Sequence, residues 1–177
     1  MKALKSIWNF VSTILVVVVV LLAIALVGVR LINLHPYVVL SGSMEPEYHV
    51  GSLIYVQPVD YKTLQVGDDI TYMVSEDTIV THRIIEVLVD EEDPETIRYF
   101  TQGIANTIPD AVSVHYKNII GKPVFSIPYL GYVSNYIQNP PGMYVAISAG
   151  AILILLVFLP DLFEDDKKKK PEEKAAE

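Results

Sequence analysis

The stretch Asp69-Ile70-Thr71-Tyr72-Met73-Val74 decides the fold, because it is rich in the β-branched and aromatic residues that favour strands. Four similar runs lie on either side of it, at residues 37–40, 52–56, 78–86 and 96–100. Turn-type sequences such as Gln57-Pro58 and Val66-Gly67-Asp68 separate these runs. Between residues 37 and 123 no helical apolar stripe rivals the alternation. We therefore expect an all-β domain over residues 35–140, built as a barrel or as a pair of sheets.

Two apolar blocks flank this domain. Residues 7–29 contain no charge, and a bilayer crossing needs roughly 20 residues, so this block is long enough to span a membrane. Residues 143–159 form a second uncharged block, near the lower limit of about 17 residues. We expect one transmembrane helix within residues 1–34, a second at 141–160 and a charged cytoplasmic tail at 161–177.

The first block has a competing interpretation as a signal peptide, because Lys2 and Lys5 precede it. The apolar region of a signal peptide is usually only about 7 to 15 residues long, so an uncleaved anchor is the better prediction. Two spans would return both termini to the same side. Lys2, Lys5 and the cluster at 167–170 assign that side to the cytoplasm by the positive-inside rule, which makes the central domain extracytoplasmic.

The composition limits the class of function. The chain has 177 residues, 51% of them hydrophobic, and its lack of cysteine excludes disulfides, thiol nucleophiles and cysteine-bound metals. Residues 35–140 hold 14 acidic against 5 basic residues, so nucleic-acid binding is not expected. The four histidines are scattered rather than placed at metal-ligand spacing, and we predict no metal and no cofactor.

One serine and one histidine are candidates for nucleophilic chemistry. The segment Ser41-Gly42-Ser43-Met44-Glu45-Pro46 follows soon after the first apolar block, and Thr81-His82-Arg83 lies further along the chain. A serine hydroxyl needs a base to take its proton, and histidine is the usual one. Taken alone, a loop serine beside glycine or a strand histidine is more often structural. Together, Ser43 and His82 suggest a membrane-anchored serine protease.

This order of motifs resembles the signal peptidase I family, in its endoplasmic-reticulum type, which also occurs in archaea and some Gram-positive bacteria. In that family a transmembrane anchor precedes an S-G-S-M-x-P motif, a G-D-[IV]-x-x-[YF] strand and a T-H-R motif. The corresponding segments here are residues 41–46, Gly67-Asp68-Asp69-Ile70-Thr71-Tyr72 and Thr81-His82-Arg83. The resemblance extends from about residue 7 to residue 133. It implies a mainly β, signal-peptidase-like domain.

The resemblance implies a role for each matching residue. Ser43 corresponds to the nucleophile, His82 to the base, and Ser41 to a residue that helps to hold the oxyanion. The third family motif, K-G-D-N-N-x-x-x-D, reads here Gln102-Gly103-Ile104-Ala105-Asn106-Thr107-Ile108-Pro109-Asp110. Ile104 replaces its first aspartate, whereas Asp110 stands at the second and also fits an ordinary turn residue. Asp110 would complete a triad with His82; if the position of Ile104 were the essential one, the enzyme would work as a dyad or be impaired.

The implied function is removal of signal peptides from exported preproteins at the membrane surface. Preproteins and the lipid bilayer are the expected partners, and the translocation machinery is a further candidate. Tyr37, Val38, Val39 and Leu40 are candidates for substrate binding through an added strand, and they also fit an ordinary core strand. The alternative from another class is a catalytically silent, membrane-tethered β domain that binds preproteins or translocation partners, and Ile104 favours it.

Overall fold

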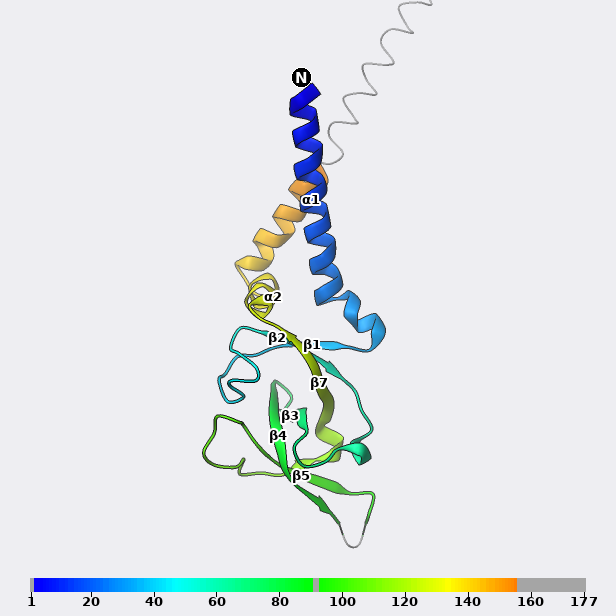
Figure 1. The fold of residues 1–177 in the computed structure, drawn as a ribbon, viewed down its shortest axis with the longest axis vertical. Coiled ribbons are helices and arrows are strands. Elements are labelled where there is room, and N and C mark those ends of the chain that lie inside the picture. The colour runs from blue at the N-terminus through cyan, green and yellow to red at the C-terminus, as the bar shows by residue number, and fades with distance from the viewer. Residues whose placement is uncertain (1, 91–92, 156–177) are drawn as a thin grey trace, which may run out of the picture. The chain divides into compact units, whose positions relative to one another are not determined.

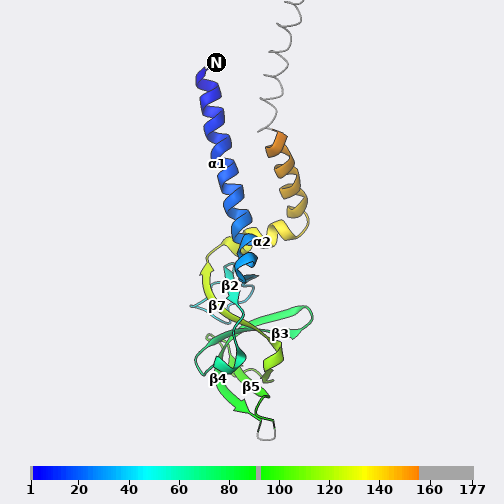
Figure 2. The same cartoon turned by 90° about the vertical axis from the view of Figure 1, so that its right-hand side faces the viewer.

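The structure is a computed structural model that describes residues 2–90 and 93–155. The chain divides into two compact units. Among the described residues, one unit combines residues 2–25 with residues 136–155, and the other is a β domain within residues 26–135. Figures 1 and 2 draw the elements from two directions.

The first unit contains the apolar N-terminal helix α1, Lys2–Leu26. Within it, Ser6–Leu26 comprises 21 residues with a mean hydropathy of 2.8, which is long and apolar enough to cross a membrane. A helix suits a bilayer because its backbone hydrogen bonds are satisfied internally. The expected N-terminal membrane helix is therefore present, whereas its retention as an uncleaved anchor stays a prediction.

A second apolar helix, Gly142–Leu155, lies within the block predicted to span at 141–160. Its described part is shorter than the roughly 20 residues of a typical crossing. Residues 156–160 and the charged tail at 161–177 lie outside the described residues. The second span, the two-span topology and the cytoplasmic position of both termini therefore stay predictions.

The β domain is built on seven antiparallel strands. They are β1 His35–Val38, β2 Leu53–Gln57, β3 Asp69–Ser75, β4 Thr78–Val89, β5 Ile97–Gln102, β6 Val114–His115 and β7 Ile119–Ile127. The order in the sheet is β1-β2-β7-β3-β4-β5-β6, with β1 and β6 at its edges, so the sheet is not closed into a barrel. The helical elements of the domain are η1 Gly28–Ile32, η2 Tyr61–Thr63, η3 Tyr116–Asn118 and α2 Leu130–Gln138.

Strand β7 joins the two halves of the sheet. Its residues around Gly121 pair with β3, and those from Lys122 onward pair with β2 (Figures 1 and 2). At Gly121 the end of β2 comes so close that a Cβ would collide with the backbone of Gln57. Glycine is therefore required where one strand passes from the first neighbour to the second.

The core of the domain lies between β3, β4, β5 and the segments that cover them. Its central buried cluster consists of Leu64, Ile70, Tyr72, Ile84, Tyr99 and Val114. Along β4, His82 and Ile84 are buried while residues 85 and 86 are exposed. His82 is thus part of a packed, hydrogen-bonded strand, which restricts the motion of its ring.

The expectation of a mainly β domain is confirmed, and all five runs read as strands form strands with slightly shifted ends. The stronger expectation of an all-β domain over residues 35–140 is wrong, because α2 occupies residues 130–138. Strand β6 was also missed, since two residues are too few to show a period.

Candidate active site

Ser43 lies in the loop that connects β1 to β2, which we call the serine loop, residues 39–52. Backbone hydrogen bonds of 2.9 Å from Val39 N to Ser52 O and from Gly51 N to Val39 O close this loop. Met44 is only 3% exposed and anchors the loop in the interior, while Ser43 is half-buried. The serine is thus presented on a short turn whose next residue is fixed by packing.

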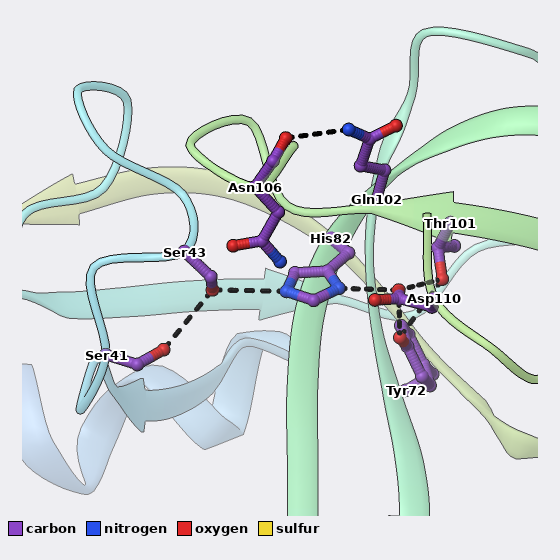
Figure 3. A network of polar contacts seen from close by, with 8 residues as sticks. All are labelled: Ser41, Ser43, Tyr72, His82, Thr101, Gln102, Asn106 and Asp110. Carbon is purple, nitrogen blue, oxygen red and sulfur yellow. Dashed lines mark hydrogen bonds and ion pairs between the residues drawn. The ribbon is translucent and has the colours of Figure 1, made fainter. Parts of the chain in front are cut away.

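His82 is presented by β4, opposite Ile70 of β3. The residue is 7% exposed. Its Nε2 lies 3.1 Å from Ser43 Oγ, although the two residues are 39 positions apart in the sequence. Figure 3 shows the imidazole ring lying between Ser43 and Asp110.

Asp110 contacts the other nitrogen of the ring. Its Oδ2 lies 2.6 Å from His82 Nδ1 and also accepts hydrogen bonds from Thr101 Oγ1 at 2.6 Å and from Tyr72 OH at 3.1 Å. An ionised carboxylate can only accept, so Nδ1 must donate to it. In a neutral ring this leaves Nε2 as an acceptor for the hydroxyl of Ser43.

The surroundings of Asp110 keep it ionised. Burial raises the pKa of this carboxyl, but the hydrogen bonds from Thr101, His82 and Tyr72, together with the charge of a protonated His82, outweigh burial and hold the pKa below its ordinary value. Burial, with the nearby charge of Asp110, raises the pKa of Tyr72 to about 12. At neutral pH Tyr72 is therefore a donor and Asp110 an acceptor, in agreement with their contact.

Ser41 lies beside the nucleophile candidate. Its Oγ is 3.2 Å from Ser43 Oγ, and either hydroxyl can be the donor. Both side chains lie in the serine loop, with Ser41 on the side of Ser43 away from Asn106 in Figure 3. If Ser43 Oγ attacks a carbonyl carbon, a hydroxyl at this position can donate to the oxyanion that forms on that carbon.

The segment after β5 packs directly against the serine. Ala105 N donates to Ser43 O at 2.9 Å. A Cβ on Gly103 would lie 2.6 Å from that carbonyl oxygen and 2.9 Å from Ser43 Cβ, so a side chain at this position would displace the serine. Gly103 and Ala105 therefore fix the main chain of Ser43 from the side of β5.

A charged network joins the serine loop to the strands that carry the histidine. Arg83 donates from Nε to Asp69 Oδ1 at 2.7 Å and from Nη2 to Asp69 Oδ2 at 3.0 Å, and Nη2 also donates to Glu47 at 3.2 Å. Tyr48 OH donates to Asp69 Oδ2 at 3.3 Å. Arg83 directly follows His82, and Glu47 belongs to the serine loop. This network therefore helps to fix the position of the loop that carries Ser43 relative to the strand that carries His82.

A cleft of about 590 Å³ opens beside Ser43 and His82. One wall is formed by Tyr37, Val38, Val39 and Leu40, and the other by the residues of β4 from Thr78 to His82. Among the described strands, β1 pairs only with β2, and β5 pairs with β4 only from Arg83 onward. Each wall therefore belongs to a strand with an unpaired edge, although both backbone groups of Val39 are bonded within the serine loop.

The structure brings together the residues that the sequence analysis proposed for the site, namely Ser43, His82, Asp110, Ser41 and residues 37–40. Sequence reasoning did not identify Tyr72 and Thr101 as partners of Asp110. Tyr72 is the last residue of the motif at 67–72, and Thr101 directly precedes the motif at 102–110. Both residues could therefore have been found by examining these motifs and their neighbours. Among the described residues, no group of three His, Cys, Asp or Glu side chains is arranged to hold a metal.

Ser43, His82 and Asp110, joined in that order by hydrogen bonds beside an open cleft, form the arrangement on which serine hydrolases rely. The chain matches the family described as signal peptidase, peptidase S26, over residues 8–101, a range that includes Ser43 and His82 but ends before Asp110. The chain belongs to this signal peptidase family.

Relatives of this chain come from bacteria and eukaryotes. The chain is 35% identical over 124 residues to Signal peptidase I W of Bacillus subtilis, covering 66% of this chain and 64% of that protein. It is 30% identical over 128 residues to the signal peptidase complex catalytic subunit SEC11C of Homo sapiens, covering 67% of this chain and 66% of that protein. It is also 30% identical over 129 residues to the signal peptidase complex catalytic subunit SEC11 of Leptosphaeria maculans, covering 67% of this chain and 73% of that protein. The match thus spans just under two thirds of the bacterial and human relatives.

Proposed function

We propose that this protein is a membrane-anchored serine endopeptidase that removes signal peptides from exported preproteins. The observation that carries the proposal is the pair of hydrogen bonds that joins Ser43 Oγ to His82 Nε2 and His82 Nδ1 to Asp110 Oδ2. Membership of the signal peptidase family supports the choice of substrate.

The reaction is acyl transfer in two steps. Ser43 Oγ attacks the carbonyl carbon of the scissile bond while His82 Nε2 takes the hydroxyl proton. His82 then gives this proton to the leaving amine, the C–N bond breaks, and the signal peptide remains as an ester on Ser43. In the second step a water molecule loses a proton to His82 and attacks the ester, and the proton returns to Ser43 as the free carboxylate leaves.

Asp110 and Ser41 support the charges that develop in this reaction. The imidazolium formed on His82 is stabilised by the carboxylate of Asp110, which also keeps the ring in the tautomer that can accept from Ser43. The oxyanion accepts hydrogen bonds from the backbone N–H of Ser43 and from the hydroxyl of Ser41, which are both in place before the reaction begins.

The cleft accommodates the substrate as an extended chain. Residues 37–40 line one wall and residues 78–82 the other, and among the described strands β1 has one unpaired edge and β4 is not paired with β5 before Arg83, so a peptide between the walls can bind as an added strand. Such binding depends on the backbone of the substrate rather than on its side chains. The selection of small residues at the cleavage site then comes from shallow pockets, as the resemblance to the family implies.

The membrane brings the substrate to the site. The chain passes from the end of α1 at Leu26 through the short η1 to β1, and the serine loop follows β1 directly. This short connection in the sequence limits how far the site can lie from the membrane surface, where the apolar segment of a signal peptide ends. We place the domain outside the cytoplasm with both termini inside, supported by Lys2 and Lys5, which precede the apolar segment Ser6–Leu26 of α1, and by the apolar helix Gly142–Leu155.

The alternative function, a silent domain that binds preproteins or translocation partners, rested on Ile104 at the position of a family aspartate. The contact of Asp110 with His82 Nδ1 supports the enzyme instead, since an aspartate is available to the base without residue 104. Assembly with the translocation machinery remains part of the proposal, and the printed name of the human relative describes a subunit of a complex.

Cleavage of a preprotein by the full chain in detergent tests the proposed function. We expect a new N-terminus at the signal junction from the intact protein and no product from His82→Ala. Ser75→Ala, which changes an exposed serine outside the cleft, is the matched control and should cleave normally. Failure of the folded intact chain on several preproteins would favour the silent binding domain.

A further inference from the structure

Asn106 lines the same cleft as Ser43 and His82, yet the proposed reaction assigns it no task. Figure 3 shows its side-chain amide pointing toward the hydrogen bond between Ser43 and His82, from the side opposite Ser41. The point where a Cβ of Gly103 would stand lies 2.8 Å from Asn106 Nδ2 and 2.9 Å from Ser43 Cβ. The side-chain amide of Asn106 and the side chain of Ser43 therefore both lie close to Gly103.

The main chain of Asn106 is fixed, whereas its side chain is available. Asn106 N donates to Gly103 O at 2.9 Å, and Gln102 Nε2 donates to Asn106 O at 2.7 Å. The preceding residue, Ala105, donates from its backbone to Ser43. Within the described part of the chain, the side-chain amide of exposed Asn106 has no hydrogen-bond partner. A fixed backbone with a free amide is an arrangement suited to binding a ligand from outside.

We propose that Asn106 binds the backbone of the substrate peptide next to the scissile bond. An Asn side chain carries both donor N–H groups and an acceptor oxygen, which are complementary to the C=O and N–H of a peptide unit. Because Ser41 stands where the oxyanion forms, Asn106 holds the peptide on the opposite side of Ser43. The contact does not depend on the side chains of the substrate, in keeping with cleavage of many sequences.

This inference rests on the proposed function of the same cleft, so its test is a binding measurement that needs no cleavage. The probe is a fluorescent synthetic peptide with an apolar segment followed by Ala-Xaa-Ala and a short polar end. Its dissociation constant is measured by anisotropy, in detergent, for full-length Ser43→Ala and for Ser43→Ala combined with Asn106→Ala. One lost hydrogen bond should weaken binding between about twofold and about tenfold.

Two matched variants separate this role from a structural one. Thr107→Ala changes the exposed neighbour, which does not line the cleft, and should leave the affinity unchanged. Asn106→Gln keeps the amide and should recover part of the affinity. In the active chain, Asn106→Ala should raise KM more than it lowers kcat, because the contact already forms in the bound substrate.

Equal affinities of the two Ser43→Ala chains, or no binding of the peptide to either, would overturn the role of Asn106. The cleavage assay with the intact chain reports on the proposed function separately. If the intact chain cleaves and the affinities are equal, only the inference about Asn106 is wrong. If it does not cleave but Asn106→Ala weakens binding, the inference stands and the proposed chemistry is wrong.

Discussion

Asp110 Oδ2 and His82 Nδ1 lie 2.6 Å apart, and this contact joins β4 to the segment after β5. The same carboxylate oxygen is held by Thr101 and Tyr72, so its position is determined by three donors rather than by the histidine alone. Asp110 thus reaches His82 although Ile104 stands where the family motif has its other aspartate. In the proposed reaction, Ser43, His82 and Asp110 therefore act as a triad.

Asp110→Asn should lower kcat by up to roughly 10⁴-fold while the chain stays folded. The neutral amide can donate to Nδ1, and the ring then carries its proton on Nε2, where it cannot accept from Ser43. The measurement is steady-state cleavage of a preprotein or peptide. Thr101→Val, which removes one donor to Asp110 at constant volume, is the matched variant and should cause a much smaller loss. Unchanged turnover of Asp110→Asn would mean that Ser43 and His82 work as a dyad.

Ser41→Ala should slow cleavage by about 10²- to 10³-fold without abolishing it, because one of two oxyanion donors is lost. The Ser43 backbone N–H remains, so residual activity is expected. Comparison of kcat and KM distinguishes this role from substrate binding, since an oxyanion donor acts mainly in the transition state and should change kcat. A variant with the turnover of the intact chain would remove Ser41 from the reaction.

Gly103→Ala should slow cleavage by roughly 10²-fold or more with little loss of secondary structure. The added Cβ would stand 2.6 Å from Ser43 O, so the serine or the segment after β5 must move. A displacement of about 1 Å is enough to cost roughly 10²-fold in rate. The checks are cleavage together with far-UV circular dichroism. As a control, Gly67→Ala adds a Cβ into open space, although its positive φ carries some strain, and it should keep activity. Full activity of Gly103→Ala would show that the close packing is not needed.

Acid should remove a contribution of Asp110 to stability. Its pKa in the folded chain lies below the unfolded value of about 3.9, so the unfolded chain binds this proton first as the pH falls. The stabilisation is therefore complete above about pH 4 and is lost as the pH drops through the folded pKa. We expect the difference in melting temperature between the intact chain and Asp110→Asn to shrink over this window. A difference that stays constant with pH would contradict the assigned pKa shift.

Much of the fold could be predicted because strand formation here follows local composition. The runs around Ile54, Ile70 and Ile84 are rich in β-branched and aromatic residues, and each forms a strand near its expected limits. The order of strands could not be predicted, since β7 inserts between β2 and β3 through contacts that are distant in sequence. Helix α2 was missed because its short sequence is rich in Tyr, Val and Ile residues, which favour strands.

The candidate site shows the same division. Ser43 and His82 lie in short motifs with recognisable chemistry, so they could be selected from the sequence. The partners of Asp110 could not, because Tyr72 lies 38 residues away from it and the register of β3 and β4 decides whether the two meet. The position of Asn106 beside Ser43 likewise depends on a close backbone approach at Gly103, which no local pattern reports.

The most direct test of the central claim is to trap the covalent intermediate on Ser43. The full chain in detergent is mixed with a synthetic signal-junction peptide, quenched in acid within the first turnover, and analysed by peptide mass spectrometry. Our account predicts an ester of the N-terminal substrate fragment on the peptide that contains Ser43, absent from Ser43→Ala, which should also fail to cleave. Cleavage by Ser43→Ala at the rate of the intact chain, with no adduct on Ser43, would contradict the account.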